Sequence, residues 1–369
     1  MRDFKTWVIS LFIIVSIILT AMAVMVSAEE RGRNSARAAT LYSPDTKSFL
    51  YEKNADVRLP MASTTKIMTA LIVIENEDLD KVIEVHPDSI GVEGSSIYLK
   101  EGDRLTVRDL LYSLLLQSAN DAATALAYEV GGSIEGFASM MNLRAKELGL
   151  TDTSFDNPHG LDSENHYTTA KELALITAEA MNNQCFADIV STYKYSFTID
   201  DSPRTVVNHN KLLKQYDGAI GVKTGFTKKS GRCLVGAAKR NGISLICVTL
   251  DAPSDWSDHR TLFDYGFDSL NSTYISELTK TDFEIPLING KKEYISASIR
   301  ENLPLVSQKS DVFTAEINIK RFISCPVYTG DVLGNVTVYK NGEYYTTIDI
   351  VSNESIEKTK ENGIFDIFK

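Results

Sequence analysis

Residues 59–70 read LPMASTTKIMTA, and the rest of the chain is organised around this stretch. Pro60 suits the first turn of a helix, and apolar residues from Ile67 onward recur at helical spacing. Ser63 and Lys66 lie three residues apart, so on a helix their side chains can touch. A serine hydroxyl needs a neighbouring base to act as a nucleophile, and an amine can serve when burial or another cation lowers its pKa. Ser63 and Lys66 are therefore a candidate nucleophile and base.

The Ser-x-x-Lys spacing is not specific by itself, because the same pattern recurs at residues 191–194 and 355–358. An N-cap-like serine beside a solvated lysine would produce the same letters. Two further motifs follow in chain order: Ser-Ala-Asn at 118–120 after an apolar helical run, and Lys-Thr-Gly at 223–225 in an extended segment. The combination of Ser-x-x-Lys, Ser-Asp-Asn and Lys-Thr-Gly is typical of class A β-lactamases and penicillin-binding proteins. This chain has Ala119 in the middle motif.

The chain resembles the low-molecular-mass penicillin-binding proteins of the serine-type D-alanyl-D-alanine carboxypeptidase family. The similarity includes YEKNAD at 51–56, SANDAA at 118–123, NPHGLD at 157–162 and HYTTA at 166–170. It is dense over residues 36–275, the expected catalytic domain. The resemblance implies an α/β (α+β) fold of the β-lactamase/transpeptidase type. This fold has an antiparallel sheet, a helical insertion and a catalytic cleft between the two.

The resemblance also implies a catalytic role for each motif side chain. Ser63 would attack the carbonyl between two D-alanines at the end of a peptidoglycan stem peptide, and Lys66 would take its proton. Ser118 would relay the proton to the leaving D-alanine. Asn120 would hold both Lys66 and the substrate amide. Lys223 would keep Lys66 neutral, because a second cation disfavours the charged form of the amine.

Substrate binding is expected along the extended segment that contains the Lys-Thr-Gly motif. Lys223 and Thr224 would bind the terminal carboxylate of the peptide. Gly225 belongs to the same strand beside the substrate. The backbone N–H groups of Ser63 and Phe226 would form the oxyanion hole.

Three histidines need separate interpretation. His209 lies where some relatives have an arginine that helps to hold the substrate carboxylate, so a clamp here would be weaker or pH-dependent. His159 and His166 are predicted to be structural, because a catalytic triad is defined by geometry that a sequence does not show. Phe226 replaces a histidine of some relatives, but only its backbone is needed.

Three functions are compatible with these motifs. The favoured function is a D-Ala-D-Ala carboxypeptidase that is acylated by β-lactam antibiotics as substrate mimics. A β-lactamase is the first alternative, but no segment like Glu-x-x-Leu-Asn, with its deacylating glutamate, lies between Ser118 and Lys223. A non-catalytic cell-wall-binding scaffold is the second alternative, but all the expected catalytic side chains are present.

Composition limits the other possibilities. The chain has 369 residues, with 43% hydrophobic and 24% charged residues, which is ordinary for a globular protein of two or three domains. Its net charge of −11 argues against a nucleic-acid partner. No Cys/His spacing suggests a metal site, and the resemblance implies no cofactor. The cysteines are Cys185, Cys233, Cys247 and Cys325. Buried free thiols are the favoured state, and a bridge between Cys233 and Cys247, which lie in strand-like runs on either side of Asn241-Gly242, is the alternative.

The N-terminus resembles an export signal. Arg2 and Lys5 precede an uncharged apolar run over residues 7–26, and Ser27 and Ala28 provide small residues for cleavage. Residues 1–28 are therefore predicted to be a cleaved signal peptide, with an uncleaved anchor as the alternative because the run is long enough to span a bilayer. In both cases the remainder would work outside the cytoplasm, in the cell wall or at the outer face of the membrane.

Hydrophobic periodicity predicts the secondary structure of the catalytic domain. A strand hairpin precedes the serine helix, helical patterns fill the middle of the domain, and strands return at its end. The predicted strands are 38–42, 48–53, 219–227, 233–238 and 243–250, and the predicted helices include 107–130, 134–148 and 170–182.

The C-terminal part has a different character. Residues 279–352 show short strand patterns with turn signals and are predicted to form an all-β domain, a spacer or docking platform without an active site. Its strands are predicted at 294–299, 312–319, 336–339 and 344–350. The resemblance to the family implies that the tail 353–369 is a weak amphipathic helix that associates with the membrane surface, and a frayed terminus is the alternative.

Overall fold

The computed structural model describes residues 34–199 and 202–359. The predicted signal peptide and the last ten residues of the tail lie outside them. The chain divides into two compact units near residue 269, with residues 241–243 grouped with the C-terminal unit. Within the described residues, no helix is long and apolar enough to cross a membrane.

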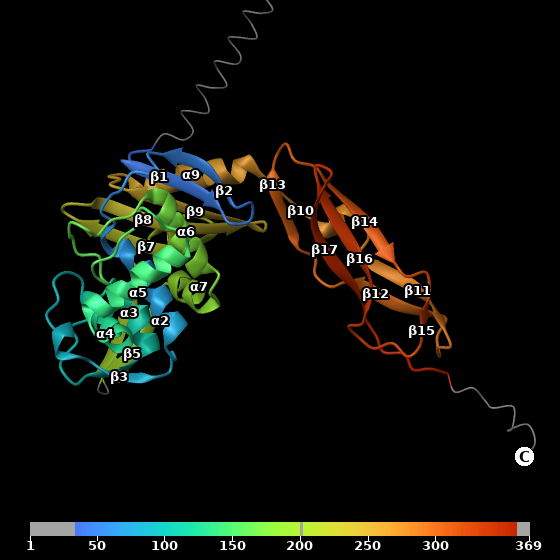
Figure 1. Cartoon of the computed structure of the whole chain (residues 1–369), viewed down its shortest axis with the longest axis horizontal. Helices are drawn as coiled ribbons and strands as arrows, with labels where there is room; N and C mark the ends of the chain where they lie inside the picture. The colour runs from blue at the N-terminus through green and yellow to red at the C-terminus, as the bar shows by residue number, and fades with distance from the viewer. Residues whose placement is uncertain (1–33, 200–201, 360–369) are drawn as a thin grey trace, which may run out of the picture. The chain divides into compact units, whose positions relative to one another are not determined.

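The N-terminal unit contains an antiparallel sheet built from both ends of its sequence (Figure 1). The strand order is β2-β1-β9-β8-β7, so β1 pairs with β9 from far along the chain. β7 comes last in the order and, among the described residues, pairs with β8 alone. The antiparallel sheet predicted from the sequence is therefore confirmed. Its strands are β1 (Ala38–Ser43), β2 (Ser48–Lys53), β7 (Ala219–Thr227), β8 (Gly231–Arg240) and β9 (Ile243–Leu250).

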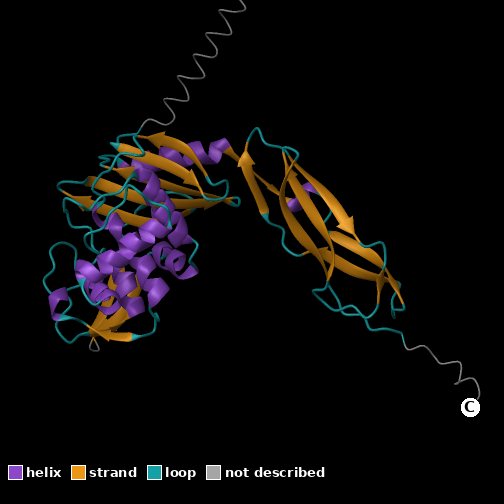
Figure 2. Cartoon of the chain, in the orientation of Figure 1, coloured by secondary structure: helices purple, strands orange, loops and turns teal. Residues whose placement is uncertain are grey.

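Helices fill the other part of this unit, as Figure 2 shows in purple. Two short hairpins accompany them, β3 (Val82–Glu84) with β4 (Arg104–Thr106) and β5 (Lys194–Ile199) with β6 (Ser202–Val207). The helices are α2 (Lys66–Asn76), α3 (Val107–Leu116), α4 (Asn120–Gly131), α5 (Ile134–Glu147), α6 (Ala170–Met181), α7 (Gln184–Ser191), α8 (Leu212–Gln215) and α9 (Asp255–Ser269).

Both faces of β1 are covered, because successive side chains of a strand point to opposite faces. Ala38 and Tyr42 belong to the main apolar core shared with the helices. Leu41 meets α9 closely, since a Cβ placed on Gly266 would lie 2.6 Å from Leu41 Cδ2. α2 lies in the middle of the core, and its residues from Lys66 to Val73 are all buried. The serine helix is therefore fixed on all sides before any substrate binds.

The predicted helix over residues 107–130 is wrong in one respect. The structure contains two helices there, α3 ending at Leu116 and α4 beginning at Asn120. Between them Ser118 has a φ of +62°, which an α-helix does not accommodate. The apolar spacing continues through the break, so the sequence pattern does not reveal it. The break brings Ser118 and Asn120 to the N-terminal end of α4.

The C-terminal unit is a β-structure, as predicted. Its main sheet has the order β14-β16-β17-β12-β11-β15, and β10 pairs with β13. It also contains a short helix, α10 (Ile275–Leu278). The strands are β10 (Leu270–Tyr274), β11 (Asp282–Ile288), β12 (Tyr294–Ile299), β13 (Pro304–Gln308), β14 (Phe313–Ile319), β15 (Ile323–Ser324), β16 (Val332–Lys340) and β17 (Glu343–Ser352).

Candidate active site

Ser63 lies in a single turn of 3-10 helix, η1 (Ala62–Thr65), directly before α2. Lys66 begins α2, and its Nζ lies 3.1 Å from Ser63 Oγ. Ala62 has a φ of +47°, an uncommon value for a residue other than glycine. The Thr65 hydroxyl donates to Ala62 O at 2.7 Å and so closes the turn. The turn before the helix thus presents the serine hydroxyl to the amine.

Lys66 is completely buried and surrounded by oxygen atoms. Its Nζ donates to Asn120 Oδ1 and to His159 O, each at 2.6 Å. A neutral amine has two N–H groups and one lone pair. With both N–H groups donated to these carbonyl oxygens, the lone pair is left for the Ser63 hydroxyl, the third neighbour. A neutral amine held in this way could accept a proton from the serine, whereas an ammonium would donate to Ser63 Oγ as its third acceptor.

Burial also favours the neutral form. Loss of hydration lowers the pKa of Lys66 well below that of a free lysine, the positive charge of Lys223 lowers it further, and Asp121 opposes this. Burial lowers the pKa of Lys223 itself to about 7. Lys223 therefore lowers the pKa of Lys66, as expected from the sequence, but the loss of hydration on burial lowers it more.

Asn120 is held in one orientation from both sides. Its Nδ2 donates to Glu93 O at 2.5 Å, so Oδ1 must face Lys66. Its backbone N–H donates to Ser95 O at 2.7 Å. Gly94 lies against the same amide, because a Cβ there would lie 2.7 Å from Asn120 Nδ2. Residues 93–95 therefore determine which atom of the amide meets the lysine.

β7 passes directly beside the serine turn. A Cβ on Gly225 would lie 3.1 Å from both Ala62 Cβ and Ser63 N, so only glycine allows this approach without displacement. The side chain of Phe226 is 66% exposed. Lys223 is buried and donates to Thr224 O at 2.9 Å. The strand thus brings its backbone, and not its large side chains, close to Ser63.

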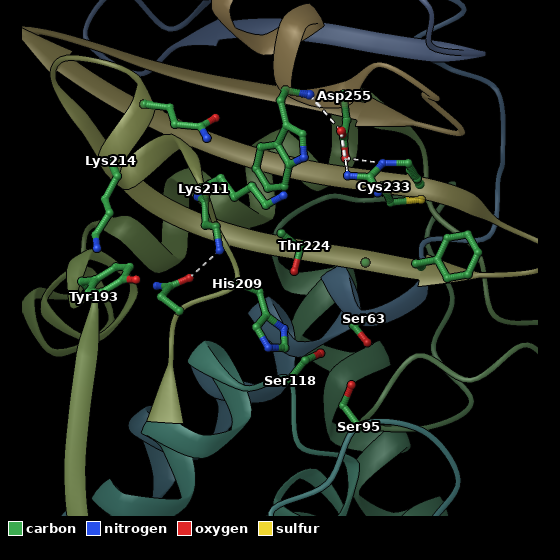
Figure 3. A pocket seen from close by; sticks show the side chains of 17 residues that line it. Ser63, Ser95, Ser118, Tyr193, His209, Lys211, Lys214, Thr224, Cys233 and Asp255 are labelled. Carbon is green, nitrogen blue, oxygen red and sulfur yellow. Dashed lines mark hydrogen bonds and ion pairs between the residues drawn. The ribbon is translucent and has the colours of Figure 1, made fainter. Parts of the chain in front are cut away.

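A pocket of about 650 Å³ opens over the serine. Figure 3 shows the hydroxyl groups of Ser63, Ser95 and Ser118 converging beside His209 and below Thr224. Lys66, Asn120 and Lys223 do not line the pocket and lie buried behind it. The other lining residues are Tyr193, Asn208, Asn210, Lys211, Lys214, Gln215, Gly225, Phe226, Arg232, Cys233, Asp255 and Trp256.

Two family models match the chain. One, described as D-alanyl-D-alanine carboxypeptidase, matches residues 23–254. The chain belongs to the D-alanyl-D-alanine carboxypeptidase family. A second model, described as penicillin-binding protein 5, C-terminal domain, matches residues 276–358.

Individual members of the carboxypeptidase family are similar over most of their length. The Bacillus subtilis D-alanyl-D-alanine carboxypeptidase DacF is 31% identical, covering 94% of each chain, and Escherichia coli DacC is 30% identical, covering 89% of this chain and 86% of DacC. The crystal structure of Francisella tularensis DacD superposes with a TM-score of 0.63 at 25% identity, covering 89% of this chain and 95% of that one. The Streptomyces K15 DD-transpeptidase has a TM-score of 0.61 at 36% identity, covering 64% and 98%.

Two histidines of this carboxypeptidase family member support the serine turn from behind. His159 is largely buried, and burial lowers its pKa to about 3. His166 Nδ1 accepts the Asp156 N–H at 3.1 Å, so Nε2 carries the proton and donates to Thr65 Oγ1 at 2.7 Å. Thr65 in turn donates to Ala62 O. Both rings are neutral at ordinary pH, which fits the predicted structural role.

His209 is the remaining predicted binding residue, and it lines the pocket. Burial lowers its pKa, and the nearby charge of Lys223 lowers it further. Near neutral pH the ring is therefore uncharged, and it can offer a carboxylate one N–H donor but no positive charge.

Sequence reasoning missed the backbone groups that position the catalytic candidates of this carboxypeptidase. His159 O and Pro158 O accept hydrogen bonds from Lys66 and from Thr69, each at 2.6 Å. The NPHGLD motif that contains these two carbonyl groups supported the family resemblance, but it did not predict their hydrogen bonds. A backbone carbonyl leaves no chemical signature in the sequence, whereas Lys211 and Lys214 beside His209 could have been noticed as a charge pair.

Replacing Lys223 with methionine is expected to flatten the pH dependence of stability. The folded pKa of about 7 lies below the unfolded value of 10.5. Between these values the unfolded chain binds more protons, so the wild-type free energy of unfolding rises with pH, by at most about 1.4 kcal/mol per pH unit from this group. Below pH 7 the desolvation cost is present in full. Urea unfolding at pH 7, 8.5 and 10 should show a smaller slope for Lys223→Met.

The same substitution at an exposed lysine is the control for this measurement. Lys146 is exposed, so Lys146→Met should keep the wild-type slope. Equal slopes for Lys223→Met and the wild type would contradict the burial argument.

Proposed function

We propose that Ser63 is the nucleophile with which this carboxypeptidase removes the terminal D-alanine from peptidoglycan stem peptides ending in D-Ala-D-Ala. The single observation that carries this proposal is the surroundings of Lys66 Nζ. Two carbonyl oxygens take its N–H groups, and Ser63 Oγ lies 3.1 Å from the same nitrogen. The amine can therefore take the serine proton at the moment of attack.

In the acylation step, Ser63 Oγ attacks the carbonyl between the two D-alanines while Lys66 accepts its proton. The carbonyl oxygen becomes negatively charged in the tetrahedral intermediate. The backbone N–H groups of Ser63 and Phe226 would stabilise this charge, which is consistent with the tight passage of β7 beside the turn at Gly225. When the intermediate collapses, the C–N bond breaks and the Ser63 ester remains.

The leaving D-alanine needs a proton on its nitrogen. Ser118 lines the same pocket as Ser63 and can relay the proton from Lys66. Ser118 is held at a positive φ, and residues in sparsely populated backbone conformations persist where the surrounding structure fixes them. The terminal carboxylate would bind Thr224 and His209 at the pocket wall, with Lys223 buried behind as a source of positive potential. Water then hydrolyses the ester and regenerates Ser63.

This function has consequences for ligands and location. A β-lactam presents a strained amide to the same nucleophile, so β-lactams would acylate Ser63 as substrate mimics. Peptidoglycan lies outside the cytoplasmic membrane, and the export-like residues 1–28 are consistent with work at that location. The match of residues 276–358 to the C-terminal domain of penicillin-binding protein 5 favours a carboxypeptidase over a β-lactamase. The assembled Ser63, Lys66 and Asn120 argue against a purely binding scaffold.

The test is D-alanine release from a synthetic peptide ending in D-Ala-D-Ala, measured with residues 29–369 and followed in parallel with labelled penicillin. Ser63→Ala is expected to abolish both release and labelling, because no nucleophile remains. Ser191→Ala changes the serine of another Ser-x-x-Lys pattern, whose hydroxyl bonds to Asp188 O, and both signals should stay at the wild-type level. Fast penicillin hydrolysis without D-alanine release would instead identify a β-lactamase.

A further inference from the structure

The pocket contains a third serine that the proposed mechanism does not use. Ser95 lines the same pocket as Ser63 and Ser118, and it is exposed. Figure 3 shows its hydroxyl directed towards the hydroxyls of these two serines. The Ser95 hydroxyl forms no hydrogen bond with any other residue that the structure describes. Because a hydroxyl can donate one hydrogen bond and accept two, this group is available to a ligand.

The backbone around Ser95 is held by hydrogen bonds to the start of α4. Ser95 O accepts the backbone N–H of Asn120 at 2.7 Å, and Glu93 O accepts Asn120 Nδ2 at 2.5 Å. The next residue, Ser96, donates its hydroxyl to Asp121 Oδ2 at 2.5 Å. Both neighbours of the Ser95 position are therefore fixed before a substrate binds. A hydroxyl on such a fixed backbone loses little freedom when it makes a hydrogen bond to a ligand.

The side chain of Asn120, by contrast, offers little to a ligand. It is 4% exposed and does not belong to the pocket lining. Its Oδ1 accepts from Lys66, and its Nδ2 donates to Glu93 O. Gly94 packs against the same nitrogen, since a Cβ there would lie 2.7 Å from it. Both polar atoms of the amide are thus engaged within the protein, and a substrate amide in the pocket needs a donor from another side chain.

Ser95 lies on the side of the pocket where the acyl part of the substrate is expected. The carboxylate of the leaving D-alanine would bind Thr224 and His209, and Ser118 would supply the proton for its nitrogen. In Figure 3 His209 and Ser95 lie on either side of Ser118. The part of the peptide that stays on Ser63 extends away from the leaving residue, and therefore towards the Ser95 hydroxyl.

We propose that the Ser95 hydroxyl donates a hydrogen bond to the carbonyl oxygen of the amide that precedes the penultimate D-alanine, and so orients this D-alanine for attack by Ser63. This inference rests on the proposed function of Ser63. Ser95 takes over the contact with the substrate amide that the sequence analysis gave to Asn120, and Asn120 keeps the task of holding Lys66. Every stem peptide has this carbonyl group, so Ser95 recognises the peptide backbone and not a particular side chain.

Two β-lactams separate this contact from the rest of the site. Benzylpenicillin carries an acylamino group whose carbonyl corresponds to that of the preceding amide, whereas aminopenicillanic acid has the same bicyclic nucleus with a free amine. Ser95→Ala is expected to lower the second-order rate constant of acylation by benzylpenicillin about 3- to 10-fold, the usual value of one neutral hydrogen bond. The constant for aminopenicillanic acid should stay within about twofold. Mass spectrometry of the acylated protein measures both reactions.

Two further variants serve as controls. Ser95→Thr keeps a hydroxyl and should retain most of the wild-type rate with benzylpenicillin. Ser139→Ala removes an exposed serine of α5, whose hydroxyl donates to Glu135 O at 2.8 Å, and should change neither rate. Ser95→Ala removes no hydrogen bond between described residues, so its urea unfolding should match that of the wild type.

The peptide substrate gives a second measurement on the same preparations. For a stem peptide ending in D-Ala-D-Ala, Ser95→Ala should lower kcat/KM for D-alanine release by the same factor as for benzylpenicillin. An equal loss with both β-lactams would overturn the assignment of Ser95 alone, as would unchanged rates with benzylpenicillin and the peptide. A wild type that neither releases D-alanine nor reacts with benzylpenicillin would overturn the proposed function as well.

Discussion

Replacing Lys66 with methionine is expected to lower kcat for D-alanine release by about 10²- to 10⁴-fold, the usual contribution of a general base. The reason is geometric, because Lys66 Nζ is the group that faces Ser63 Oγ between two carbonyl acceptors. Lys66→Arg should be equally inactive, since a guanidinium keeps its proton at all accessible pH values. Single-turnover acylation by labelled penicillin would measure the chemical step directly.

The Lys66→Arg variant distinguishes a lysine that acts as a neutral base from one that supplies only a positive charge. If a positive charge alone were needed, Lys66→Arg would retain much of the activity, and the neutral-base assignment would fail. The decrease of the wild-type kcat at low pH provides a second readout. Because activity requires the unprotonated amine, kcat should fall as pH drops through the lowered pKa of Lys66. Lys223→Met should move this decrease to higher pH, because it removes the neighbouring positive charge that lowers that pKa.

Gly160→Ala is expected to reduce both activity and stability. A Cβ on Gly160 would lie 2.0 Å from Ala62 O, and the residue has a φ of +90°. Backbone atoms cannot rotate away as a side chain can, so the segment that supplies His159 O must separate from the serine turn. A displacement of about 1 Å in such a constellation costs on the order of 10²-fold in rate. The collision and the backbone strain together should lower the free energy of unfolding by about 2–4 kcal/mol.

A matched glycine isolates the collision from the strain. Gly149 has a φ of +75° and nothing within 4 Å of an added Cβ, so Gly149→Ala carries the strain alone. It should cost about 1–2 kcal/mol and leave kcat near the wild-type value. Urea denaturation and D-alanine release measured on both variants give the comparison. Similar kcat values for the two variants would show that the approach of Gly160 to Ala62 does not position the site.

Local sequence patterns predicted the parts of the fold that depend on periodicity. The strands of the antiparallel sheet were found because alternation and turn residues are encoded nearby in the chain. The break at Ser118 was missed because the apolar spacing of α3 continues into α4, while the tertiary structure holds Ser118 at a φ of +62°. Helix α9 was also missed, since polar residues outnumber apolar residues in its sequence.

In the candidate site, too, the features that depend on tertiary structure could not be predicted from local sequence patterns. Side chains that carry chemistry, such as Ser63 and Lys66, could be proposed from their spacing and family resemblance. The partners of Lys66 could be predicted only in part, because Asn120 Oδ1 belongs to a motif, whereas His159 O is a backbone atom. Other lining residues of the pocket come from segments that are far apart in the sequence. Lys214 and Tyr193 are brought together by the fold and not by any local pattern.

The pairing of β1 with β9 also determines when the protein can become active during its production. Ala38 pairs with Leu250 and Tyr42 with Ile246. The first strand therefore cannot form its sheet pairing until β9, which is about 200 residues further along the chain, has been synthesised. Pairings between such distant segments form slowly, because the entropy cost of closing a long loop comes before the stabilising contacts form. Until then the β1–β2 hairpin has no sheet to join, and isolated hairpins are marginally stable in water. We therefore expect a nascent chain to remain without its catalytic sheet until nearly all of its catalytic unit has been made.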